Sequence, residues 1–484
     1  MPRRAAVVLI AIVTIATLAR VAATHRVFSP TYDEPAHVFG GYEYLVDGRY
    51  TFDTSHPPLA RIVFAWPMRD AGATGHDVRK RVGDVFESAG DYMTGVVTAR
   101  RGNLLFLAIA ILGVAWLAFE LAGPVVAVMA TLLFALLPPV LAHGGLATTD
   151  IPVTAAFAVA MAVFHRWLRS PNWPWTAALA MALGFGLLTK FSFPVYFTVT
   201  AIAMMIAARR WPIPRGVAAS AGALVIVWLT YFINRLARFF RGFLVVMQHN
   251  AEGHDAYFLG AVRATGWWEY FPVVFTIKTP IAFLLLAAIG AFFGLRAREH
   301  RLLLVVAALI LLVAMTSRIN LGVRHVLPIY VPLSIIAATG IGHIWRTRAR
   351  WLAPALVTWL AFNSFTAHPD YLPWMNAFAG KHPERIVLDS NFDWGQDVVR
   401  LRDACRELRI ERIGVELFGT TDYARIGMPA THVIPRDAGA PGWYAVSEGF
   451  VIPAQVRDPR AYRWLTDGRP FRRIGKTIRL YHVQ

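Results

Sequence analysis

Two adjacent carboxylates, Asp33 and Glu34, follow the first apolar stretch of the chain and lie between Pro30 and Pro35. The prolines disfavour a helix just before them, and acids in such a place have no packing purpose. One interpretation is that Asp33 or Glu34 caps a short helix that starts at Pro35. The other is chemical, because a carboxylate fixed at the edge of an apolar environment can act as a general base. Both interpretations are compatible.

A second polar group follows in the next part of the chain, where two prolines start another short amphipathic helix. Asp53 and His56 precede these prolines and Arg61 follows them. Alone, His56 would be a turn histidine. Together with the Asp33–Glu34 pair about twenty residues before it, His56 becomes part of a specific arrangement.

The elements that must hold these residues are membrane-spanning helices. Of the 484 residues, 56% are apolar and 16% are charged, against roughly 45–50% and 25% in soluble proteins. About eleven apolar runs are long enough for transmembrane helices, and the first is expected to remain uncleaved. The runs lie near residues 5–24, 102–121, 124–142, 151–168, 175–189, 193–208, 216–234, 271–295, 302–316, 326–344 and 351–366.

The net charge of +18 reflects topology rather than binding to nucleic acid, because the basic residues cluster in short loops on one side of the predicted membrane. This asymmetry predicts a multi-pass protein of the cell membrane with a cytoplasmic N-terminus. Residues 25–101, 235–270 and 367–484 then lie outside the cytoplasm. The single cysteine, Cys405, excludes an intrachain disulfide.

We therefore expect two domains: a transmembrane domain over 1–366, whose outer loop 25–101 carries the acids, and an extracytoplasmic α/β domain over 367–484. In the second domain, a charged stretch at 395–408 predicts a helix, and runs at 413–418 and 443–446 predict strands.

Several cations contradict the positive-inside trend, because they lie at the outer ends of predicted helices. We interpret them as a phosphate site, and for each alone the alternative is a side chain that snorkels to lipid headgroups. The candidates are Arg100, Arg101, Lys190, Arg324 and His325, joined by His56 and Arg61.

Other polar residues have structural alternatives. Asp150 is either an N-cap or part of the site. Trp267, Trp268 and Tyr270 are membrane anchors or sugar contacts. Finally, acids that recur every fourth residue are either caps and surface groups or one side of a metal site; these are Asp389, Asp393 and Asp397.

These residues resemble a known family: the protein O-mannosyltransferases and their bacterial relatives in glycosyltransferase family 39, which have the GT-C fold. The similar stretches span nearly the whole chain. They are Asp33-Glu34 with His37, Phe39 and Gly40; Phe52-Asp53 with His56-Pro57-Pro58-Leu59 and Arg61; residues 141–150; 188–192; 266–272 with 278–280; 322–328; 389–397; and 442–447.

The resemblance implies a GT-C enzyme that transfers one sugar from a polyprenyl-phosphate donor to an extracytoplasmic hydroxyl acceptor, with inversion. It implies Asp33 as the base, with Glu34 orienting the acceptor or Asp33. His37, Asp53 and Asp150 are further candidates for contacts with the acceptor or sugar. The carbohydrate-recognition domain of eukaryotic members has no counterpart here, so the acceptor is a protein, a lipid or a glycan.

No cofactor is required by this chemistry, although a divalent ion between Asp33 or Glu34 and the phosphate stays open. The main alternative is a transporter or flippase for lipid-linked sugars. That alternative predicts ionisable residues at mid-membrane depth and internal repeats, whereas this chain keeps its acids in the outer loops.

Overall fold

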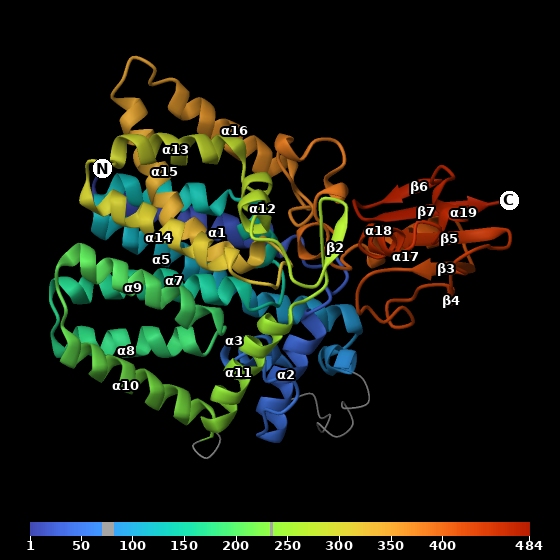
Figure 1. Cartoon of the computed structure of the whole chain (residues 1–484), viewed down its shortest axis with the longest axis horizontal. Helices are drawn as coiled ribbons and strands as arrows, with labels where there is room; N and C mark the ends of the chain where they lie inside the picture. Colours follow the sequence, from blue (N-terminus) through green and yellow to red (C-terminus); the bar gives the residue numbers. More distant parts are fainter. Residues whose placement is uncertain (70–81, 233–235) are drawn as a thin grey trace.

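The computed structural model describes residues 1–69, 82–232 and 236–484. Figure 1 shows a bundle of long helices with a small sheet at one end. The N-terminus lies at the opposite end of the bundle, and the C-terminus lies in the sheet region. The expected helical architecture with a C-terminal sheet is therefore confirmed. Parts of the predicted outer loop 25–101 and of the predicted run 216–234 lie outside the described residues.

Apolar helices that coincide with the predicted runs build the bundle. They are α1 (Arg3–Ala22), α5 (Tyr92–Ala135), α7 (Asp150–Arg169), α8 (Trp173–Leu187), α9 (Ser192–Ala208), α10 (Ile213–Thr230), α12 (Tyr270–Lys278), α13 (Ile281–Gly294), α14 (Arg298–Met315), α15 (Tyr330–Trp345) and α16 (Leu352–Thr366). Helix α5 covers two predicted runs. Between them its backbone leaves the helical conformation at Gly123, where φ is 80°, and Pro124 follows.

Within the described ranges, five helices are long and apolar enough to cross a membrane, or six if the bent pair α12 and α13 forms one span. The structure thus agrees with a multi-pass membrane protein, but the predicted number of about eleven spans is not confirmed. One reason is length: α8 and α16 have 15 residues and α9 has 17, below the ~20 that span a typical bilayer.

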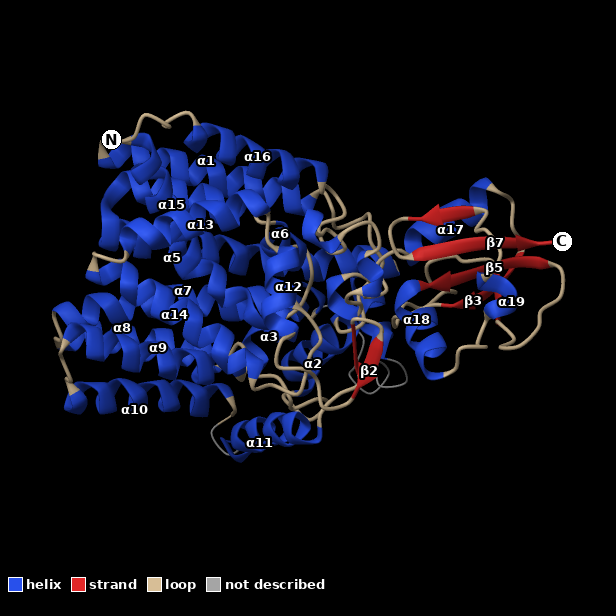
Figure 2. Cartoon of the chain, turned by 45° about the horizontal axis from the view of Figure 1, so that its top comes forward, coloured by secondary structure: helices blue, strands red, loops and turns tan. Residues whose placement is uncertain are grey.

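Shorter helices connect those of the bundle, and Figure 2 shows α2 and α3 at the side of the bundle that faces the sheet. The two predicted after prolines are present as α2 (Glu34–Asp47) and α3 (Pro58–Ala65). The others are η1 (Trp66–Met68), η2 (Val82–Ala89), α6 (Pro138–Gly144), α11 (Leu236–Glu252) and η3 (Val323–Ile329), with a hairpin of β1 (Ala256–Phe258) and β2 (Ala261–Arg263).

The sheet has five strands in the order β4-β3-β5-β7-β6. β3 (Arg412–Glu416) runs parallel to β4 (Ala430–Val433) and β5 (Gly442–Ser447), whereas β7 (Ile478–Val483) runs antiparallel to β5 and β6 (Arg472–Ile474). The helices of this region are α17 (Val398–Glu407), α18 (Glu448–Arg457) and α19 (Arg463–Thr466). Leu401 and Cys405 of α17 pack on Ile413 of β3.

The chain between α16 and α17 does not belong to the cores of the sheet. It contains η4 (Ala377–Ala379), η5 (Pro383–Arg385) and η6 (Asp389–Asn391). Its apolar side chains, among them Tyr371 and Trp394, are buried with the helices of the bundle. The sheet has two separate cores of its own. The segment that follows the predicted boundary at residue 366 therefore packs with the transmembrane domain.

Candidate active site

Polar side chains from separate parts of the chain meet where the bundle faces the sheet. They come from the residue before α2, the first turn of α7, the turn between α8 and α9, η3 and the segment after η6. Two ion pairs form the centre of this cluster: Asp33 with Arg324, and Asp150 with Lys190. We call these four residues, together with the polar side chains of His143, Thr148 and His325 beside them, the acid–cation cluster.

Asp33 occupies the N-cap position of α2, but its side chain makes no capping hydrogen bond. Instead, Arg324 Nη1 donates to Asp33 Oδ2 at 2.6 Å. The guanidinium of Arg324 lies over the ring of Trp394, 4.3 Å from its centroid. The Asp33 side chain keeps 26% of its surface exposed, against 9% for Arg324. The capping interpretation of Asp33 is therefore wrong, and its carboxylate is held at an accessible position by a buried cation.

Asp150 lies in the first turn of α7, where Thr149 occupies the N-cap position. Its Oδ1 accepts a hydrogen bond from Lys190 Nζ at 2.5 Å, and both side chains are almost fully buried. The carboxylate thus pairs with a cation rather than capping its helix. Lys190 reaches it from the turn between α8 and α9, which is one of the outer positions that the sequence singled out.

Three histidines surround these ion pairs. His325 lies near the charged groups of Arg324, Lys190 and Asp150 and near the ring of His143. His56 Nδ1 lies 3.5 Å from Thr149 Oγ1.

Burial and the nearby His37 and Arg61 lower the pKa of His56 well below its usual value. This environment disfavours the charged form of His56, and its predicted contact with a phosphate stays a prediction.

Some buried polar atoms of the acid–cation cluster have no hydrogen-bond partner among the described residues. Buried polar groups are normally paired, so a concentration of unpaired donors and acceptors is typical of a site for a polar ligand. The atoms are Arg324 Nε, His325 Nε2, His143 Nδ1, Thr148 Oγ1 and Asp150 Oδ2.

Glu34 has a different environment from Asp33. Its two carboxylate oxygens accept hydrogen bonds from Arg100 Nε at 2.8 Å and Nη2 at 2.7 Å. Burial alone would raise the pKa of Glu34, but Arg100 and the N–H groups of Ala147 and Thr31 hold it below its usual value. The remaining Arg100 donors bind the carbonyls of His25, Phe28 and Ser29. Glu34 and Arg100 thus form a buried ion pair, and their predicted roles in catalysis and phosphate binding stay predictions.

Arg61 is also committed to partners within the protein. It is fully buried, pairs with Asp53 and donates to Tyr50 and to His37 Nδ1. Burial and Arg61 lower the pKa of His37 to about 4, so His37 is neutral at pH 7. These contacts tie α3 to α2 beneath the acid–cation cluster. The predicted phosphate contact of Arg61 and the predicted sugar contacts of His37 and Asp53 stay predictions.

The remaining candidates lie outside the acid–cation cluster or beneath it. Arg101 is exposed. Trp267 packs edge-on against Phe258, and Trp268 is 67% exposed. Tyr270 is buried, and its hydroxyl accepts a hydrogen bond from Asn391. The predicted sugar contacts of Trp267, Trp268 and Tyr270 stay predictions.

The segment around η6 contributes acids that we had interpreted from the sequence as caps and surface groups or one side of a metal site. Asp389 is half-buried near Arg324 and Asp33, and desolvation raises its pKa to about 6 although Arg324 opposes the shift. Asp393 and Asp397 are buried, not solvated as expected. The dense run of polar residues from Asp389 to Asp397 was the available signal, but nothing in it names Arg324 as a neighbour.

Among the described residues, no group of three or more His, Cys, Asp or Glu side chains is arranged to hold a metal ion. The divalent ion that was left open from the sequence stays a prediction.

Comparison with solved structures finds proteins of similar fold. The fold is similar to that of ArnT from Cupriavidus metallidurans bound to undecaprenyl phosphate, with a TM-score of 0.56 and 15% identity over 98% of this chain and 97% of that chain. The apo state of the same protein gives a TM-score of 0.51 and 16% identity over the same shares. A comparison with curated proteins finds no match.

Residues 11–238 match the family model described as dolichyl-phosphate-mannose-protein mannosyltransferase. This match covers just under half of the chain and agrees with the resemblance seen in the sequence. The solved structures with a similar fold are of membrane glycosyltransferases of the same GT-C class.

Proposed function

We propose that this protein transfers one sugar from a polyprenyl-phosphate donor to a hydroxyl acceptor, with inversion, at the acid–cation cluster. The observation that carries the proposal is the position of Asp33: a partly exposed carboxylate held against buried cations and unpaired polar atoms. The fold likeness to a protein bound to undecaprenyl phosphate supports the donor class.

In the proposed reaction, Asp33 accepts the proton of the acceptor hydroxyl while the acceptor oxygen bonds to the anomeric carbon. The bond from that carbon to the phosphate oxygen breaks on the opposite face, and the polyprenyl phosphate leaves with the electron pair. Lys190 and Arg324 stabilise the negative charge of the leaving phosphate, and His325 offers a hydrogen bond. Attack opposite to the leaving group accounts for inversion.

We further propose that the acid–cation cluster faces away from the cytoplasm. The predicted short loops with most arginines lie at the other end of the helices, as the positive-inside rule expects for the cytoplasmic side. The acceptor can then be a protein, a lipid or a glycan of the cell envelope.

The test compares wild type with Asp33→Asn, using release of free polyprenyl phosphate from a panel of polyprenyl-phosphate sugars. The purified protein is reconstituted in lipid with crude envelope as acceptor. Loss of a general base predicts a decrease of ~10² or more in rate. The matched control is Asp467→Asn, at an exposed position after α19, which should keep wild-type activity. If Asp33→Asn is as active as wild type, the proposed mechanism is wrong.

A further inference from the structure

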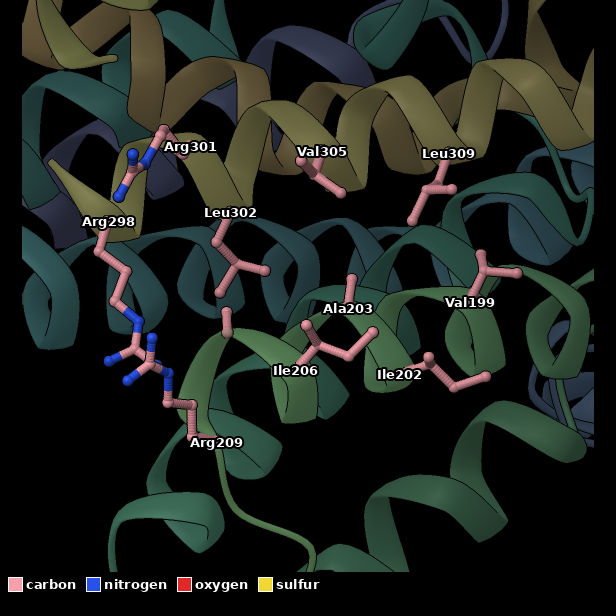
Figure 3. Close-up of a pocket in the computed structure, with 11 residues that line it drawn as sticks. Val199, Ile202, Ala203, Ile206, Arg209, Arg298, Arg301, Leu302, Val305 and Leu309 are labelled. Carbon is pink, nitrogen blue, oxygen red and sulfur yellow. The ribbon is translucent and has the colours of Figure 1, made fainter. Parts of the chain in front are cut away.

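A groove with an apolar lining runs along the outside of the bundle between α9 and α14 (Figure 3). Its volume is about 910 Å³, within the roughly 300–1,000 Å³ of typical small-molecule sites. Eight apolar residues and three arginines line it: Val199, Ile202, Ala203, Ile206, Ala207, Leu302, Val305, Leu309, Arg209, Arg298 and Arg301.

The three arginines gather at one end of this groove. Figure 3 shows the guanidinium groups of Arg209 and Arg298 pointing toward one another, with Arg301 on the same side and the apolar side chains extending away from them. This is the end of the bundle where the N-terminus lies (Figure 1), opposite the acid–cation cluster.

Within the described part of the chain, no salt bridge joins these three arginines to a carboxylate. Arg298 also borders a neighbouring pocket lined by Glu120 and Glu299. Of these acids, Glu120 pairs with another arginine: its Oε2 lies 4.0 Å from Arg169 Nη1. Two guanidinium groups that converge repel each other unless an anion lies between them. The arrangement therefore favours an anionic ligand at the mouth of the groove.

The backbone at Arg209 supports a dedicated role for its side chain. Arg209 ends α9 in the left-handed conformation, with φ of 50°, and its N–H bonds to the carbonyl of Ile206. Helices usually place glycine in this conformation, because a side chain there is strained. An arginine at this position is uncommon and directs a guanidinium towards Arg298.

We propose that the groove binds an anionic diacyl phospholipid of the membrane leaflet at this end of the bundle. The arginines bind the phosphate, since guanidinium groups match phosphate oxygens in bidentate geometry. The acyl chains lie against the apolar residues of α9 and α14. A free phosphate would leave the apolar lining unused. The donor lipid of the proposed reaction needs its phosphate at the other end of the bundle.

The test measures phosphatidylglycerol bound to the full-length protein in mild detergent, by native mass spectrometry and by the rise in melting temperature that added lipid causes. The groove variant carries Arg209→Gln, Arg298→Gln and Arg301→Gln. The matched control carries Arg346→Gln, Arg348→Gln and Arg350→Gln, three exposed arginines between α15 and α16. Wild type and control should retain phosphatidylglycerol, and the groove variant should lose at least tenfold in affinity.

A second variant, Ala203→Phe, fills the apolar part of the groove and keeps all three arginines. It should also weaken phosphatidylglycerol binding, which distinguishes a seated lipid from general attraction to positive charge. Unfolding without added lipid reports whether each variant is folded.

The proposal is overturned if the arginine control loses as much binding as the groove variant. It is also overturned if phosphatidylcholine binds equally well, or if a polyprenyl phosphate binds the groove in preference to phosphatidylglycerol.

Discussion

Asp33 and Glu34 are adjacent in the chain and carry the same charged group, yet their surroundings separate them. Glu34 is buried and shares both oxygens with Arg100, so its carboxylate stabilises the start of α2. Asp33 stays partly exposed and contacts Arg324 with one oxygen, Oδ2. A group that must accept a proton from a substrate needs access to that substrate, and between the two residues only Asp33 has it.

At the residue scale, we therefore expect opposite results from two isosteric changes. Glu34→Gln leaves Arg100 buried with a neutral partner, and breaking a buried ion pair costs about 3–5 kcal/mol. Its melting temperature should fall markedly. Asp33→Asn should lose less stability, because Asp33 is 26% exposed and solvent screens its pair with Arg324, although its activity is lost. Thermal unfolding of both variants in the same detergent checks this expectation. A similar loss of stability in Asp33→Asn would mean that Asp33 is also structural.

Among the elements, the segment from η6 to the start of α17 positions the site, because it bonds to both sides of the Asp33–Arg324 pair. On one side, the N–H groups of Ser29 and Tyr32 donate to the carbonyls of Gln396 and Trp394, both at 3.0 Å. On the other side, Val323 N donates to Asn391 Oδ1 at 2.9 Å. The loop that carries Asp33 and the helix that carries Arg324 are thus aligned by a third segment.

This arrangement predicts a kinetic effect of Trp394→Leu, which removes the aromatic face beneath Arg324. Cation–π contacts contribute about 0.5–2 kcal/mol, so kcat should fall by roughly 2- to 30-fold. Trp394→Phe, which keeps an aromatic face, should recover part of the rate. Steady-state kinetics on the polyprenyl-phosphate sugar that wild type consumes in that panel check this. A change in protein yield or melting temperature without a change in kcat would show that Trp394 only fills space.

For the whole molecule, the sheet and the bundle are joined by contacts between distant parts of the chain. Arg425, beyond β3, pairs with Asp84 at 2.7 Å and with Glu87 at 3.1 Å, and both acids belong to η2. The sheet therefore lies on the same side of the membrane as the acid–cation cluster. If the positive-inside rule holds for this chain, both are extracytoplasmic.

Cysteine labelling in intact cells tests this orientation. Asp437→Cys lies at an exposed position in the sheet region, and Arg348→Cys lies between α15 and α16 at the other end of the bundle. A membrane-impermeant thiol reagent should label the first variant and leave the second unlabelled until the cells are lysed. The native Cys405 is buried, which keeps the background low. The opposite pattern would place the acid–cation cluster in the cytoplasm.

Several features of this protein were predictable from the sequence because they depend on local properties. Apolar runs predict the helices of the bundle, prolines mark the starts of α2 and α3, and loop charge predicts orientation. The cations at outer helix ends were found in the same way. The acid–cation cluster indeed brings together Lys190, Arg324 and His325. A cation that contradicts the positive-inside rule has no topological cause, so it indicates a local interaction.

The partners of these residues depended on the tertiary structure. Asp33 and Arg324 are 291 positions apart, and Glu34 and Arg100 are 66 positions apart. Hydropathy and periodicity describe neighbours along the chain. They could not distinguish Arg324, which keeps an unpaired Nε, from Arg100, whose donors are all bound within the protein. Packing decides which of the two adjacent acids reaches a substrate and which cation pairs with each acid. The physical reason is that residues distant in sequence set the burial and hydrogen bonding of both carboxylates.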